Sequence, residues 1–124
     1  TYKDFEMLFM GDAGVKAFNE INKYIPQNID VLKVGHHGAR GIVDNKMAEY
    51  LSPKISVIST GINYFGHPSK GTLDVLRKSS IYRTDKNHSI QISTDGTSSK
   101  VYTFNSTIHK YELNKTIQNQ VPEP

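Results

Sequence analysis

Short apolar runs alternate with longer amphipathic stretches along the first two thirds of the chain. The runs at 5–10, 29–34 and 55–59 are too short for three helical turns, and a glycine follows each within two residues, a pattern that favours buried strands. The segments between and after these runs have apolar side chains at helical spacing, and they cover residues 13–24, 45–51 and 72–78. This alternation predicts an α/β protein with β-α-β-α-β-α order, right-handed crossovers and a mostly parallel sheet.

The pattern changes after about residue 80. Residues 80–83, 89–93 and 100–104 are short runs of β-forming residues, and the hairpin dipeptide Asp95-Gly96 separates the last two. They predict an antiparallel ending to the fold. Residues 105–124 contain few apolar side chains, so we expect a flexible polar tail that either frays or forms one loosely attached strand near 108–113. We therefore divide the chain into a folded part, 1–104, and a tail, 105–124.

Composition narrows the classes of site that the chain can contain. A length of 124 residues fits one domain, and the sequence has no cysteine, which excludes disulfides and thiolate zinc ligands. No window has the roughly 18 consecutive apolar residues of a membrane helix, so we expect none in this chain. The net charge of +3 gives a mild preference for anionic partners.

Residues able to bind a metal or move a proton follow three of the apolar runs. Asp12 follows the first, His36 and His37 follow the second, and His67 lies in the loop after the third. Loops at the carboxyl ends of parallel strands meet at one end of an open sheet, so Asp12, His37 and His67 are expected to converge. A carboxylate with two or three imidazoles suits zinc, manganese or iron.

Each of these features also has an ordinary structural explanation. Asp12 could cap the following helix, the two adjacent histidines could bond to backbone, and Gly66-His67-Pro68 could be a rigid turn. For Arg83 and Asp85 a surface ion pair is the favoured interpretation. From the residues alone, the sequence predicts a His/Asp metal site on an α/β domain.

Four segments resemble a known family. They read FMGDA at 9–13, DVLKVGHHG at 30–38, STGINYFGHP at 59–68 and IYRTD at 81–85. In this order they are similar to the metallo-β-lactamase-fold hydrolase domain at the C-terminus of ComEC-type DNA-internalisation competence proteins and in free-standing relatives. The resemblance covers residues 5–95 and implies the C-terminal half of an αββα fold, because the chain contains no HxHxDH motif.

The resemblance implies roles for individual residues. Asp12 matches the carboxylate that bridges two metal ions, and His67 matches the last histidine ligand. His37 matches a residue of the site wall that contacts a phosphate or passes a proton, and His36 is the less favoured of the pair. The substrate-binding group implied in this way is His36, His37, Gly38 and Arg83.

The same resemblance implies metal-dependent hydrolysis of phosphodiester bonds by a nuclease-type domain linked to DNA uptake. Zinc or manganese would be the cofactor, and two ions would bind only together with the missing N-terminal half, so this chain alone is expected to be inactive. The substrate would be DNA or another phosphodiester. An alternative is a non-catalytic module that binds nucleic acid or another anionic ligand on the same fold.

A half-domain is also expected to expose an apolar sheet face. Removing the other sheet would leave strand residues in contact with water over a larger area than monomers usually tolerate. We therefore expect the missing N-terminal half, or a second copy of the chain, to cover this face. The residues expected on it are Phe5, Met7, Phe9, Val31 and Val57.

Overall fold

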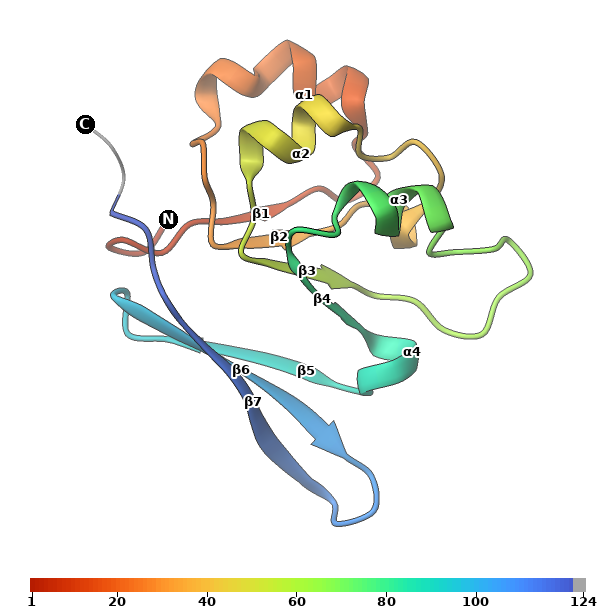
Figure 1. The fold of residues 1–124 in the computed structure, drawn as a ribbon, viewed down its shortest axis with the longest axis vertical. Helices are drawn as coiled ribbons and strands as arrows, with labels where there is room; N and C mark the ends of the chain where they lie inside the picture. The colour runs from red at the N-terminus through yellow and green to blue at the C-terminus, as the bar shows by residue number, and fades with distance from the viewer. Residues whose placement is uncertain (122–124) are drawn as a thin grey trace.

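The fold contains two sheets, one parallel and one antiparallel, in a computed structural model that describes residues 1–121 (Figure 1). The parallel sheet has the order β1-β2-β3-β4. Its strands are β1 (Met7–Phe9), β2 (Val31–Lys33), β3 (Ile55–Ile58) and β4 (Ser80–Arg83). The protein is therefore a mixed α/β fold, as the alternating pattern predicts.

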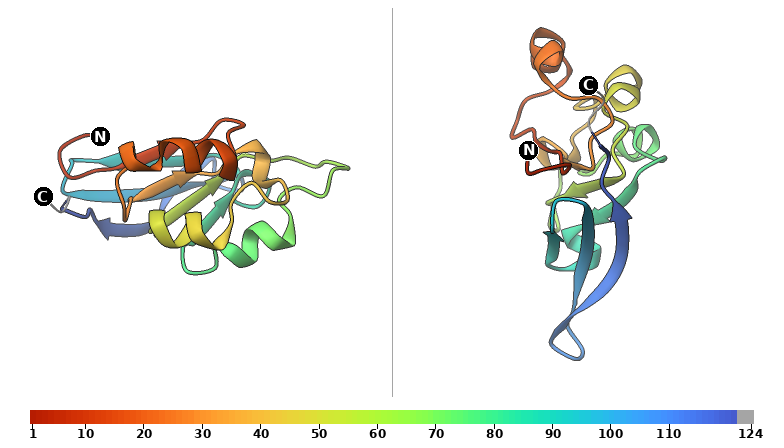
Figure 2. Two further views of the ribbon diagram at one scale, coloured as in Figure 1. Left: turned by 90° about the horizontal axis from the view of Figure 1, so that it is seen from above. Right: turned by 90° about the vertical axis from the view of Figure 1, so that its left-hand side faces the viewer.

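Helices between the parallel strands cover one face of that sheet (Figures 1 and 2). Side chains cap two of them: Asp44 accepts from the amide of Met47 at 2.8 Å, and Ser69 accepts from that of Thr72 at 3.1 Å. Among residues 1–121, none of the helices combines the length and apolar character that a bilayer crossing needs. The helical elements are α1 (Val15–Ile21), η1 (Asn22–Tyr24), η2 (His36–Gly38), α2 (Asn45–Leu51), α3 (Lys70–Val75) and α4 (Thr84–Asn87).

The main core lies between these helices and the parallel sheet. Leu32 and Ile58 from the strands are buried there against Met47 and Leu51 of α2 and Phe18 of α1. These residues come from the apolar positions of the predicted strands and helices. Burial of the apolar faces of the helices against the sheet therefore holds these helices and strands together in one unit.

The antiparallel sheet covers the opposite face of the parallel sheet (Figure 2). It has the order β5-β6-β7, with β5 (Ile90–Thr94), β6 (Ser98–Asn105) and β7 (Lys110–Gln118). Val101 and Ile117 from this sheet pack into a second core with strand residues of the parallel sheet. The chain thereby supplies a cover for the inner face of its own sheet.

That cover corrects the expected exposure of the inner face. Val31 and Val57 are only 0% and 9% exposed to solvent, because the second sheet packs over them. Phe5 and Met7 are half-buried against the same core. Phe9, at the end of the edge strand β1, is 70% exposed. The large contiguous apolar face predicted for a half-domain is therefore reduced to the end of β1.

Two other predictions differ from the structure. Residues 80–83 were predicted to begin the antiparallel ending, but β4 pairs parallel with β3, with Ile55 opposite Ser80. The α3 crossover returns the chain to the end of the sheet where β3 began. Within the predicted polar tail, β7 pairs with β6 from Lys110 to Gln118, a longer strand than that expected near 108–113. The last three residues of the predicted tail, 122–124, lie outside the described residues.

Candidate functional site

The predicted site residues lie at the carboxyl ends of the parallel strands or in the loops that follow them. Because β1 to β4 are mutually parallel, their carboxyl ends lie on the same side. Asp12 lies in the turn after β1, the two adjacent histidines lie in η2 after β2, and His67 lies in the β3–α3 loop. Arg83 is the last residue of β4. The loops that carry these residues therefore lie at the same end of the parallel sheet (Figure 1).

The turn that carries Asp12 packs against the start of the histidine turn. The amide of His36 donates a hydrogen bond to the carbonyl oxygen of Gly11 at 2.9 Å. Gly35 makes this approach possible, since a Cβ there would lie 2.9 Å from the Gly11 oxygen and 3.1 Å from the Ala13 oxygen. Asp12 itself is exposed. The carboxylate is therefore presented from a backbone that is fixed next to His36.

The histidine turn has an unusual backbone. His36 and His37 are consecutive residues in the left-handed region, with φ of 43° and 55°. This conformation costs roughly 1–2 kcal/mol for a residue with a Cβ, and such strain concentrates at functional sites. Hydrogen bonds from Gly38 to Gly35 at 2.9 Å and from Ala39 to His36 at 3.0 Å hold the turn.

The imidazole rings gather in front of this turn. The ring centroid of His36 lies 5.8 Å from that of His67, edge to face, and 6.4 Å from that of His37. His37 Nδ1 is 2.7 Å from the carbonyl oxygen of Ser59. A carbonyl can only accept, so Nδ1 carries the proton, and in the neutral ring Nε2 is the acceptor. His37 is exposed and so presents a nitrogen that can take up a proton.

His67 has a fixed backbone and an unpaired ring nitrogen. Its amide donates to Asn63 Oδ1 at 3.0 Å, and its carbonyl accepts from Asn63 Nδ2 at 2.8 Å. Its Nδ1 is buried and has no hydrogen-bond partner among the residues that the structure describes. A buried polar atom without a partner is costly. A bound cation would satisfy this nitrogen, which makes His67 the strongest ligand candidate at this edge.

The loop after His67 is fastened to the histidine turn. The amide of Ser69 donates to the carbonyl of Gly38 at 2.9 Å, and Thr72 Oγ1 donates to the Ala39 carbonyl at 2.8 Å. Gly38 has φ of +77°, and a Cβ there would lie 2.7 Å from Pro68 Cβ. The peptide bond between His67 and Pro68 is cis. Glycine at position 38 thus permits the close approach that places His67 beside His36.

Arg83 forms the ion pair that was the favoured interpretation of its sequence context. Its Nε and Nη2 lie 3.0 and 2.6 Å from the two carboxylate oxygens of Asp85. The Arg83 hydrogen bonds hold the pKa of Asp85 below its usual value. Next to this pair, Thr84 Oγ1 accepts from the amide of Thr60 at 2.8 Å and donates to its carbonyl at 2.7 Å. Arg83 is thereby positioned next to the β3–α3 loop.

The structure describes no complete metal centre in residues 1–121. Those residues contain no group of three or more His, Cys, Asp or Glu side chains arranged to hold an ion. The orphaned nitrogen of His67 and the oxygen donor of Asp12 fit part of a ligand set for zinc or manganese. Further ligands would have to come from outside the described residues.

Sequence reasoning missed the residues that order these loops. Hydrogen bonds that involve backbone atoms hold His37, His67 and the β3–α3 loop in place. The residues that make these bonds are Ser59, Thr60, Asn63 and Thr84. Asn63 lies between two glycines of the β3–α3 loop, at 61 and 66. Asparagine in such a loop is a signal for side-chain bonding to nearby backbone, and it would have identified this anchor.

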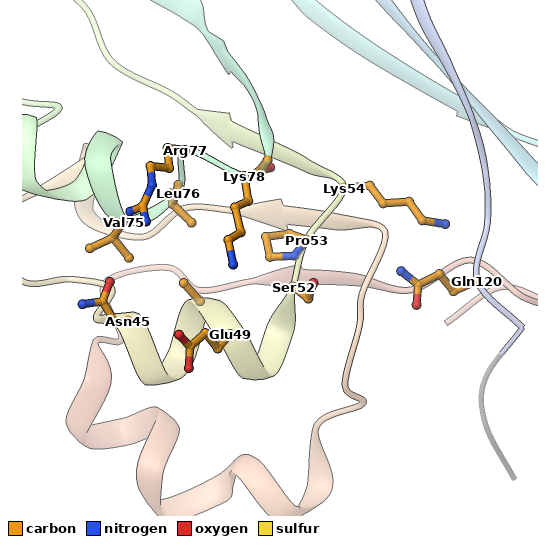
Figure 3. A pocket seen from close by; sticks show the side chains of 12 residues that line it. Asn45, Glu49, Ser52, Pro53, Lys54, Val75, Leu76, Arg77, Lys78 and Gln120 are labelled. Carbon is orange, nitrogen blue, oxygen red and sulfur yellow. The ribbon is translucent and has the colours of Figure 1, made fainter.

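A pocket of about 350 Å³ lies at the opposite edge of the sheet (Figure 3). Residues near the amino ends of β3 and β4 line it, among them Lys54 and Lys78, together with Glu49 of α2. It contains none of the predicted site residues. The candidate site lies instead at the carboxyl ends of the strands.

Comparison with known proteins finds a similarity to one curated protein. No family model matches the chain, and no solved structure matches it. The chain is 38% identical to ComE operon protein 3 of Bacillus subtilis (strain 168) over 88 residues, which is 68% of this chain. The chain is therefore similar to a short region of ComE operon protein 3 and spans 11% of that protein's length.

Proposed function

We propose that this chain is part of a metal-dependent phosphodiester hydrolase of the nuclease type that acts in DNA uptake. The similarity to ComE operon protein 3 supports a role in competence, and the resemblance of the four loop motifs to the metallo-β-lactamase-fold domain of ComEC-type proteins suggests the chemistry. Helices on a parallel sheet, backed by an antiparallel sheet, suit half of an αββα fold. The net charge of +3 suits a polyanionic substrate.

The observation that carries the proposal is the unpaired Nδ1 of His67. This nitrogen is buried and without a partner, in a ring that lies 5.8 Å from that of His36. The backbone of His36 is bonded to the turn that presents Asp12. Asp12 and His67, two residues of types that bind divalent ions, thus lie on loops that both contact His36. An ordinary turn or helix cap gives no reason for the orphaned nitrogen.

In the proposed site, Asp12 and His67 hold a zinc or manganese ion together with ligands from outside this chain. The ion would supply Lewis-acid charge at a phosphoryl oxygen. His37 passes a proton through Nε2, because Ser59 holds its other nitrogen in the protonated form. His36 and Arg83 are the further phosphate contacts in this proposal, and Gly38 allows the loops to approach.

The remaining metal ligands would come from a second segment of polypeptide. The outermost strand of the parallel sheet, β1, offers a place where such a segment could pack. β1 is an edge strand, and Phe9 at its end is 70% exposed beside the turn of Asp12. A segment from the rest of a longer protein, or from a second copy, could pack against this end and bring further ligands. The chain spans 11% of the length of its relative, so such segments are available there.

An assay of DNA hydrolysis by the full-length protein tests the proposal. With Mn²⁺ or Zn²⁺ the protein should cleave DNA, and Asp12→Ala or His67→Ala should each reduce the rate by more than about 100-fold, beyond the effect usual for residues that only support a ligand. His109→Ala, on the exposed β6–β7 turn, is the matched control and should change little. The 124-residue chain alone should show no appreciable hydrolysis.

Two results would contradict the proposal. Full activity in the Asp12 and His67 variants would show that the reaction does not use this edge of the sheet. Binding of DNA by the full-length protein without cleavage under any divalent ion would favour the non-catalytic binding module instead.

A further inference from the structure

The loop between β3 and α3 exposes large apolar side chains next to the candidate site. Ile62 and Tyr64 are both fully exposed, at 103% of the reference surface, and Phe65 is 83% exposed. Seen from above, the loop extends beyond the end of the sheets (Figure 2). Large apolar side chains that are exposed together in this way commonly mark a binding surface.

Looseness of the loop does not explain this exposure. Asn63 Nδ2 donates to the carbonyl of Gly61 at 2.9 Å and to that of His67 at 2.8 Å, while its Oδ1 accepts from the amides of Phe65 and His67 at 3.1 and 3.0 Å. One buttressing side chain thus spans the loop. Ile62 before it and Tyr64 and Phe65 after it are therefore exposed on an ordered backbone.

The exposed aromatic surface is continuous with the candidate metal ligand. The Phe65 ring stacks on that of His67 with centroids 5.8 Å apart and planes 21° from parallel. Residues 61–69 contain no acidic side chain, so nothing in the loop repels a phosphate. A flat ligand stacked on the outer face of Phe65 or on Tyr64 would therefore lie next to His67 without repulsion from any acidic side chain of this loop.

We propose that Tyr64 and Phe65 form a stacking platform for unpaired nucleobases, which guides a single strand of nucleic acid to His67. This proposal rests on the proposed function, since it names the form in which the phosphodiester substrate reaches that site. Aromatic side chains beside a phosphate-binding surface are the usual means of holding single strands. Bases in a duplex already stack on one another and cannot use such a platform.

Binding of labelled oligonucleotides to the 124-residue chain, with EDTA present, tests the platform separately from hydrolysis. Three probes are compared by fluorescence anisotropy: an oligothymidylate, an abasic strand of equal length, and a hairpin duplex. The single strand with bases should bind most tightly. Tyr64→Ala combined with Phe65→Ala should weaken that binding about tenfold or more, because the bases lose the aromatic rings on which they stack, and should leave the affinities of the other two probes unchanged.

Tyr24→Ala is the matched control, because Tyr24 is 77% exposed but lies on η1, and it should leave all three affinities unchanged. Tyr64→Phe should retain binding, because the ring alone stacks. Equal affinity for the abasic strand and the oligothymidylate would overturn the platform, and so would unchanged affinity in the double variant. EDTA removes free divalent ions, so this assay measures oligonucleotide binding without hydrolysis. A failure of the stacking platform here can therefore be distinguished from a failure of hydrolysis in the full-length assay.

Discussion

Lys54 Nζ lies 3.2 Å from Oδ1 of Asp30, a carboxylate with no exposed surface. The same carboxylate accepts hydrogen bonds from the amide of Glu6 at 3.0 Å and from that of Gln120 at 3.1 Å. It therefore connects the segments before β1, β2 and β3 with the segment after β7. This connection lies at the edge of the sheet opposite the histidines and joins the last strand to the first three.

We expect Asp30→Ala to lower the free energy of unfolding by about 3–5 kcal/mol, because it removes the carboxylate partner of the partly buried Lys54 ammonium and leaves the amides of Glu6 and Gln120 without their acceptor. Urea denaturation of the chain measures the change. The control is Asp74→Ala, which removes the exposed ion pair with Lys70 and should cost less than about 0.5 kcal/mol. Similar losses in both variants would show that Asp30 does not have this role.

Gly38→Ala should lower the free energy of unfolding by about 2–4 kcal/mol, from the left-handed backbone and the clash with Pro68 together. The matched control is Gly61→Ala, since no atom lies within 4 Å of a Cβ at that position, and it should change stability by less than about 0.5 kcal/mol. Thermal and urea unfolding compare the two. Equal stability of the two variants would mean that the loop of His67 is not fastened to the histidine turn.

The contribution of the Arg83–Asp85 ion pair to stability should decrease as the pH falls. Because the pKa of Asp85 is lower in the folded protein, its stabilising contribution is fully present above the unfolded value of about 3.9. It is lost as the pH falls from there through the lower folded value. An NMR titration of the Asp85 carboxyl should show the low midpoint, and Arg83→Met should move it up toward the usual value. An unchanged midpoint in Arg83→Met would rule out Arg83 as the cause.

Local pattern predicted the elements whose signal is a buried apolar face. The strands near Leu32 and Ile58 and the helix of Met47 belong to this group, because their side chains form the main core. The direction of β4 was predicted wrongly, since pairing direction depends on the α3 crossover and not on residues 80–83 themselves. The length of β7 was underestimated because Ile117 is its one buried side chain. The ladder with β6 uses backbone groups that every sequence has.

The site was predictable to the extent that it follows from strand ends. A glycine and a polar residue after each apolar run indicated Asp12, His37 and His67 without knowledge of the tertiary structure. The left-handed backbone of the histidine turn and the anchoring by Asn63 and Thr84 depend on contacts between loops far apart in sequence. No periodicity encodes such contacts, so these features required the structure.

Paramagnetic line broadening by Mn²⁺ tests most directly the claim that Asp12 and His67 are metal ligands. In an NMR titration of the 124-residue chain with MnCl₂, we expect weak binding that broadens first the resonances of residues 11–13, His36, His37 and His67. Asp12→Ala or His67→Ala should remove this selective broadening, and His109→Ala should preserve it. Broadening centred elsewhere on the chain, or broadening that persists unchanged in the Asp12 and His67 variants, would contradict the claim.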